Sequence, residues 1–151
     1  MDLKKNIVAS GSSDNSIKIW DLKSKKCTGV LNGHTDSVNF IITSMDQKFL
    51  FSASFDKMIK MWDLKTRTCR MTLNGHLDSV NCLHLLKTGE LVSGSTDKTI
   101  KIWDIKSNMC LATLNEHQNG VFFIAQFGDD SLITASNDYT LKVFKISSEK
   151  A

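Results

Sequence analysis

The stretch TIKIWD, Thr99–Asp104, decides the fold of this chain because it is one of four copies of the same phrase. The other copies are SIKIWD at Ser16–Asp21, MIKMWD at Met58–Asp63 and the weaker TLKVFK at Thr140–Lys145. Successive copies start 42, 41 and 41 residues apart. Self-similarity at a fixed period is the signature of a repeat architecture, in which each copy forms one structural unit.

Other residue types keep the same register as this phrase. An aspartate precedes each copy, and a histidine lies upstream of the last three, giving Asp14, Asp56, Asp97 and Asp138, and His34, His76 and His117. Chance does not align three residue types in one frame. The sequence therefore predicts a single repeat domain over 1–151, with copies at about 1–32, 33–74, 75–115 and 116–151.

Each copy has the pattern of short strands. The phrase itself alternates apolar and polar residues with a period of two, as a half-buried strand does. Brief apolar or small-residue runs at Phe49–Ser54, Leu91–Ser95 and Ser131–Ser136 each end at an aspartate-containing stretch that is typical of tight turns. The chain has no proline and no long helical pattern, so we predict an all-β fold.

The repeat resembles the WD40 family. The markers are the Gly-His pairs Gly33-His34 and Gly75-His76 and the three Trp-Asp pairs that close the first three copies of the phrase. The resemblance covers nearly the whole chain, and it implies a β-propeller built from four-stranded blades around a central channel.

In the family's strand order the chain supplies 14 strands, or about 3.5 blades. Two strands are expected near 6–11 and 16–21, a third near 26–32, full sets over 37–73 and 79–114, and three strands over 120–146. The family's usual ring of about seven blades would need roughly twice this length. Three explanations stay open: a piece of a longer protein, which we favour, a half-ring that assembles with a second copy, or a stand-alone arc.

Histidine, serine and aspartate recur together and invite a hydrolase interpretation. A serine nucleophile would need an exposed turn beside a general base, whereas these serines lie inside strands and the set is duplicated in every copy. In the WD40 family the matching residues form a structural hydrogen-bonded chain from Trp through Ser or Thr and His to Asp. We therefore predict no catalytic residues and three structural sets: His34, Ser52, Asp56 and Trp62; His76, Ser93, Asp97 and Trp103; and His117, Thr134 and Asp138.

Two positions weaken the last set. Phe144 has no N–H group to donate where the other copies have tryptophan, so that network should be incomplete. Glu116 replaces the glycine that precedes the histidine, which would strain the backbone if that position required a positive φ.

The resemblance also implies where partners would bind, because family propellers commonly use the face that carries these turns and the starts of the innermost strands. Phe55 and Phe122 are the aromatic candidates for anchors there, although Phe122 packing within its own blade is an equal alternative. The remaining candidates are small or polar: Ser13, Ser37, Asn39, Ser79, Asn81, Thr96, Gly120 and Asn137.

The leading functional hypothesis is a non-catalytic protein-interaction scaffold or substrate-recruiting module. A net charge of +3 and a pI near 8.7 keep a nucleic-acid-binding propeller as the alternative, although the lysines are spread along the chain rather than clustered with aromatics. A serine hydrolase is the third and weakest reading. We expect protein or peptide partners, self-association as one possibility, and neither a metal site nor a cofactor.

The cysteines bear on the compartment. Cys27, Cys69 and Cys110 share one repeat position, so we expect them on different blades as small buried side chains, without disulfides or zinc. The start, Met1–Lys5, has no signal-peptide pattern, and no apolar run approaches the length of a membrane span. These features predict a cytoplasmic or nuclear protein, with the cytoplasm favoured.

Overall fold

The computed structural model describes residues 6–146, and within this range the prediction of an all-β chain with 14 strands is confirmed. Residues 1–5 and 147–151, at the outer ends of the first and last predicted repeats, lie outside the described residues. The strands form four antiparallel sheets of three or four strands. The chain divides into two compact units, one ending at Val80 and the other beginning at Asn81.

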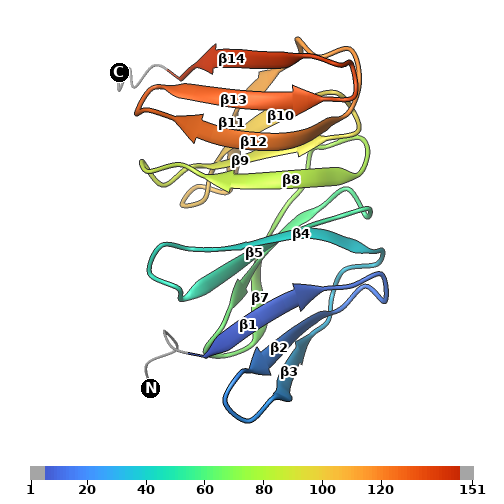
Figure 1. Cartoon of the computed structure of the whole chain (residues 1–151), viewed down its shortest axis with the longest axis vertical. Coiled ribbons are helices and arrows are strands. Elements are labelled where there is room, and N and C mark those ends of the chain that lie inside the picture. Colours follow the sequence, from blue (N-terminus) through green and yellow to red (C-terminus); the bar gives the residue numbers. More distant parts are fainter. Residues whose placement is uncertain (1–5, 147–151) are drawn as a thin grey trace. The chain divides into compact units, whose positions relative to one another are not determined.

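The first unit contains a three-stranded and a four-stranded sheet, in which consecutive strands pair as neighbours (Figure 1). The three-stranded sheet consists of β1 (Ile7–Gly11), β2 (Ile17–Asp21) and β3 (Lys26–Leu31). The four-stranded sheet consists of β4 (Val38–Thr43), β5 (Phe49–Ser54), β6 (Ile59–Asp63) and β7 (Thr68–Leu73).

The second unit repeats this plan with a four-stranded and a three-stranded sheet. The four-stranded sheet consists of β8 (Val80–Leu85), β9 (Leu91–Ser95), β10 (Ile100–Asp104) and β11 (Met109–Leu114). The three-stranded sheet consists of β12 (Val121–Phe127), β13 (Ser131–Ser136) and β14 (Leu141–Lys145), which lie side by side in that order (Figure 1).

The turns that follow β1, β5, β9 and β13 share one scheme. The residue after the turn aspartate has a positive φ, from 64° to 74°, at Asn15, Lys57, Lys98 and Tyr139. Asp56 illustrates the rest, since its N–H donates to Ser54 Oγ and its carboxylate accepts from the N–H of Met58. The aspartate therefore closes the turn that the sequence pattern predicts.

The first unit has a core formed between the facing sides of its two sheets. Ile17, Ile19 and Leu31 of the β1–β3 sheet are at most 5% exposed, and they pack with Leu50 and Trp62 of the β4–β7 sheet. The alternating pattern of the phrase explains this arrangement because its two isoleucines point to the same side of β2.

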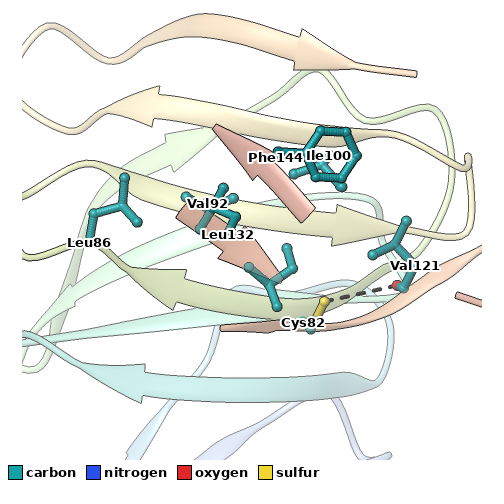
Figure 2. Close-up of a cluster of buried hydrophobic side chains, with 8 residues drawn as sticks. Cys82, Leu86, Val92, Ile100, Val121, Leu132 and Phe144 are labelled. Carbon is teal, nitrogen blue, oxygen red and sulfur yellow. Dashed lines mark hydrogen bonds between the residues drawn. The ribbon is translucent and has the colours of Figure 1, made fainter. Parts of the chain in front are cut away.

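The second unit repeats this packing with different side chains. Cys82, Val92 and Ile100, from the β8–β11 sheet, meet Leu132 and Phe144 from the β12–β14 sheet (Figure 2). The sheets approach so closely at Gly94 that a Cβ atom there would lie 2.7 Å from Val121 Cγ1. Glycine at this position is therefore required by close approach rather than by backbone conformation.

The prediction that three cysteines are buried is wrong. Cys27, Cys69 and Cys110 are exposed, while Cys82 is buried, and burial raises the pKa of the Cys82 thiol to about 12. The three exposed thiols lie on β3, β7 and β11, which are edge strands of their sheets, so no further strand covers them. Each donates to the backbone carbonyl two residues along, at 3.3–3.4 Å.

Candidate functional site

The polar set of the β4–β7 sheet forms a continuous hydrogen-bonded chain. The Trp62 indole N–H donates to Ser52 Oγ at 2.8 Å, and Ser52 Oγ lies 2.7 Å from His34 Nε2. On the other side of the imidazole, Nδ1 lies 2.6 Å from Asp56 Oδ2. This series of hydrogen bonds connects four parts of the repeat. They are β6 with Trp62, β5 with Ser52, the loop before β4 with His34, and the turn between β5 and β6 with Asp56.

The partners of His34 favour its neutral form. With Asp56 ionised, Nδ1–H donates to the carboxylate, and Nε2 is left to accept from the Ser52 hydroxyl, whose oxygen in turn accepts from Trp62. Burial lowers the pKa of His34 below its ordinary value of 6.5, and it outweighs the opposing effect of Asp56. Burial alone would raise the pKa of Asp56, but hydrogen bonds from His34 and from the N–H groups of Thr35 and Met58 lower it overall.

The last repeat keeps this arrangement without the indole. His117 Nε2 lies 2.8 Å from Thr134 Oγ1, and Nδ1 lies 2.8 Å from Asp138 Oδ2. Phe144, in the place of tryptophan, makes a T-shaped contact with the imidazole, with ring centroids 6.3 Å apart. A side-chain hydrogen bond from Thr140 is the largest contribution that lowers the pKa of Asp138.

The other two repeats show parts of the same chain of contacts. Trp20 donates to Ser10 Oγ at 2.9 Å, and Trp103 donates to Ser93 Oγ at 2.8 Å. His76 is buried, with 6% of its surface exposed. Asp97 accepts from both the N–H and the hydroxyl of Thr99, which closes the turn between β9 and β10.

The glutamate before His117 does not strain the backbone. Gly33 and Gly75, the glycines of the Gly-His pairs, have φ values of 154° and 150°. Glu116 is not among the residues with positive φ, so the loop has a different local conformation there. The loop still delivers His117 to its two partners.

The geometry of these sets does not suit nucleophilic catalysis. Ser52, Ser93 and Thr134 have 0% of their surface exposed, so a substrate cannot reach their hydroxyl groups. In the β4–β7 set the hydroxyl is already engaged by both an indole and an imidazole. A nucleophile needs an accessible oxygen beside its base, and this arrangement offers a rigid, satisfied network instead. Within residues 6–146, no three His, Cys, Asp or Glu side chains gather as a metal site.

The predicted partner-binding residues of the first unit lie at the ends of the strands, where the turns after β1 and β5 are found. We call this side of the sheets the turn-bearing edge. The N–H of Phe55 donates to the carbonyl of Ser37 at 3.0 Å, which fixes this turn beside the loop that enters β4. Phe55 itself is 47% exposed, and Ser13 and Asn39 are exposed near the same edge. Ser79, which is half-buried, precedes β8 and donates its N–H to Asp78.

The candidates of the second unit form a similar edge with one exception. The N–H of Asn137 donates to the carbonyl of Gly120 at 3.0 Å, and Phe122 is 47% exposed. Gly120 is buried, and a Cβ atom there would lie 3.0 Å from the Phe122 ring and 3.2 Å from Thr96 Cα. Gly120 is therefore unsuited to contact a partner, and its role is to let Phe122 and Thr96 approach.

The two asparagine candidates are partly used by the fold. The Asn39 amide donates to the carbonyl of Val80 at 3.1 Å, and the Asn81 amide donates to the carbonyl of Val121 at 3.1 Å. The Asn81 amide also donates to Thr96 Oγ1 at 3.0 Å. These amides brace the backbone that follows one repeat later, which reduces what they can offer a partner.

Tyr139 is an exposed aromatic residue at a turn position that sequence reasoning missed. It is 100% exposed and follows the turn aspartate at a φ of 64°, where the other repeats have Asn15, Lys57 and Lys98. A bulky residue in this left-handed conformation is uncommon. The signal was available in the sequence, because an aromatic ring replaces a polar side chain at a fixed turn position.

Comparison with known proteins agrees with this geometry. The family model for the WD domain, G-beta repeat, matches at residues 3–21, 25–63, 67–104 and 108–145. The chain belongs to the WD40 family. The family's propellers are typically non-catalytic and generally bind protein partners.

Two curated proteins match short segments of the chain. Cell division control protein 4 of Saccharomyces cerevisiae is 44% identical over 43 residues, covering 28% of this chain and 6% of that protein. Nuclear distribution protein PAC1 of Arthroderma benhamiae is 45% identical over 47 residues, covering 31% of this chain and 10% of that protein. The matched segments therefore span a tenth or less of these curated relatives.

A solved structure gives the more extensive match. The WD40 β-propeller domain of Doa1 superposes with a TM-score of 0.88 at 27% identity, covering 98% of this chain and 49% of that chain. The fold-class prediction is thereby confirmed. Among the described residues of this WD40 chain, no helix is long and apolar enough to cross a membrane.

Proposed function

We propose that this WD40 chain is a non-catalytic protein-interaction module that recruits peptide segments of other proteins to its turn-bearing edge. The observation that carries the proposal is the Phe55 side chain, which is 47% exposed on a turn whose backbone is fixed. Its own N–H is bonded to Ser37, and the adjacent Asp56 carboxylate holds the N–H groups of Thr35 and Met58.

A rigid exposed aromatic side chain is a favourable anchor for a peptide. Binding costs less conformational entropy when the anchor is already held in place, and aromatic residues dominate the energetic centres of interfaces. The nearby exposed side chain of Ser13 is small and polar, which suits a rim around an apolar contact. Buried histidine–serine–aspartate sets support this function by making the edge stiff.

The nucleic-acid alternative has weaker support. Several surface lysines are paired with acids, as in Lys18–Asp14, Lys48–Asp46, Lys87–Asp129 and Lys145–Asp130, and these pairs are solvent-exposed. The acids lower the positive potential that phosphate groups would need. Binding to a nucleic acid would fall steeply with salt, whereas an aromatic-anchored peptide contact should change little.

We also propose a reducing compartment, the cytoplasm before the nucleus. The support is chemical, because the four cysteines are all free thiols and three of them are exposed.

The test uses a peptide selected from a random displayed library on the wild-type chain. We expect Phe55→Ala to weaken binding of this peptide at least ~10-fold by calorimetry, as loss of a central aromatic anchor does. The melting temperature should stay unchanged because half of the ring is already in solvent. Met45→Ala is the matched control, since Met45 is 68% exposed in the β4–β5 loop at the opposite end of β5.

Two results would contradict the proposal. In the first, Phe55→Ala lowers the melting temperature while the affinity stays the same, which would make Phe55 a packing residue. In the second, Phe55→Ala and Met45→Ala reduce the affinity equally, which would show that the peptide does not use the turn-bearing edge.

A further inference from the structure

One face of the β12–β14 sheet is apolar and exposed. Phe123 is 53% exposed, Leu141 72% and Val143 64%, and cross-strand pairing places Ile133 and Ala135 beside them. We call these five residues the β12–β14 outer face. Alternate residues of the same strands, such as Leu132 and Phe144, point to the opposite side and are buried in the core of the second unit.

The preceding repeat contains the equivalent of this face in a packed state. Forty-one residues earlier, the positions of Phe123, Ile133, Ala135, Leu141 and Val143 hold Cys82, Val92, Gly94, Ile100 and Ile102. Cys82, Val92 and Ile100 are buried against the next sheet, and Figure 2 shows them meeting Leu132 and Phe144. Ile100 is 1% exposed, whereas its counterpart Leu141 is 72% exposed. The β12–β14 outer face thus keeps the apolar character of a face that packs on another sheet.

The β1–β3 sheet exposes a face of the type on which a preceding sheet packs. Val8 is 45% exposed and Val30 43%, and Trp20 lies opposite Val8 in the strand pairing. We call Val8, Trp20 and Val30 the β1–β3 outer face. In the β4–β7 sheet, 42 residues later, the positions of Val8 and Trp20 hold Leu50 and Trp62.

Leu50 and Trp62 receive the preceding sheet in the core of the first unit. They are each 1% exposed and pack against Ile17, Ile19 and Leu31. The chain therefore contains two packed examples of one type of contact between sheets, and it also exposes one copy of each half of that contact.

We infer that the β12–β14 outer face of one chain packs on the β1–β3 outer face of a second copy. The two faces are different, so the contact is head-to-tail, and each chain carries both halves. A second copy suits both faces, because this chain exposes each half of the contact that it also packs twice within its own units. Large exposed apolar faces on sheets commonly mark such association.

The test measures molar mass by light scattering on the whole chain. We expect the wild type to have at least twice the 16.9 kDa of one chain at tens of micromolar, and Leu141→Lys and Val8→Lys each to have the mass of one chain. Leu111→Lys is the matched control, because Leu111 is 58% exposed on β11 and belongs to neither face. Circular dichroism checks that each variant keeps its β-sheet, and Val143→Lys repeats the test on the same face.

An equal mixture of Leu141→Lys and Val8→Lys distinguishes a head-to-tail contact from one between identical faces. Each mixed pair keeps one contact with both halves unchanged, so the mixture should regain the mass of two chains. A wild type with the mass of one chain at 100 μM, on the order of a weak dimer's dissociation constant, overturns the inference. So does association that Val8→Lys leaves intact, or a mixture that stays at the mass of one chain.

Discussion

The polar sets of the second and fourth repeats differ at two positions, Ser52 against Thr134 and Trp62 against Phe144, and the second difference separates two roles of the tryptophan. In the second repeat Trp62 both donates to Ser52 and packs its ring against His34, with centroids 6.0 Å apart. In the fourth repeat Phe144 keeps the ring contact, at 6.3 Å, and cannot donate.

The bonds of the histidine survive this change. His117 holds Thr134 and Asp138 at 2.8 Å each, close to the 2.7 Å and 2.6 Å of the second repeat. The indole N–H is thus not needed to position the imidazole, and in the second repeat it adds a further hydrogen bond to the buried hydroxyl. The comparison predicts how each set responds when its aromatic residue is exchanged.

The largest effect should come from making the second repeat resemble the fourth. Trp62→Phe removes a donor from the buried Ser52 hydroxyl and leaves a void where the larger ring packed. We expect a loss of about 2 kcal/mol in the free energy of unfolding. Chemical denaturation followed by circular dichroism, at one fixed protein concentration, measures it. An unchanged stability would show that the indole N–H contributes nothing.

The reverse exchange should give a smaller effect of opposite sign. Phe144→Trp supplies a donor for Thr134 Oγ1, and we expect a gain of up to about 1 kcal/mol by the same denaturation measurement. Phe144→Leu is the control, because it removes the aromatic contact with His117 without adding a donor, and it should destabilise the chain. If the tryptophan variant is less stable than the wild type, the last sheet has no room for an indole.

The smallest effect should appear in the pH dependence of the second repeat. His34 has a lower pKa in the folded chain than its ordinary 6.5, because it is buried. The folded state therefore binds fewer protons than the unfolded chain, so its stability is fully present above about pH 6.5 and declines as the pH falls below that value. Asp56, whose pKa is also lowered, adds a second loss as the pH falls below its ordinary 3.8.

Nuclear magnetic resonance titration of the His34 ring in the folded protein tests this directly. A midpoint above 6.5 would reverse the sign, because it would mean that the charged imidazole is favoured by Asp56 more than it is penalised by burial.

The sequence was sufficient to predict the strands, and it grouped the residues whose side chains are in contact in the second and fourth repeats. The period of 41–42 residues and the alternation inside each phrase determine which side chains share a face, and the strand bounds follow within a few residues. The sets could be predicted because a buried serine, histidine and indole all need partners, and the repeat places them in one frame.

Exposure was harder to predict because it depends on neighbours that the pattern of one repeat does not contain. Cys27 has the same repeat position as Cys69 and Cys110, but a shared position says nothing about whether an edge strand is covered. Gly120 resembles a surface loop residue in sequence and is nevertheless buried under Phe122. Leu141 continues the apolar pattern of Ile100, and only the three-dimensional packing shows that it is exposed.

The central claim is that the recurring histidine, serine and aspartate are structural, and the free energy of unfolding of Ser52→Ala tests it most directly. This substitution leaves the Trp62 N–H and His34 Nε2 without their shared partner in a fully buried site. We predict a loss of about 1–3 kcal/mol, against no change for the exposed Ser13→Ala. A Ser52→Ala variant as stable as the wild type would contradict the account.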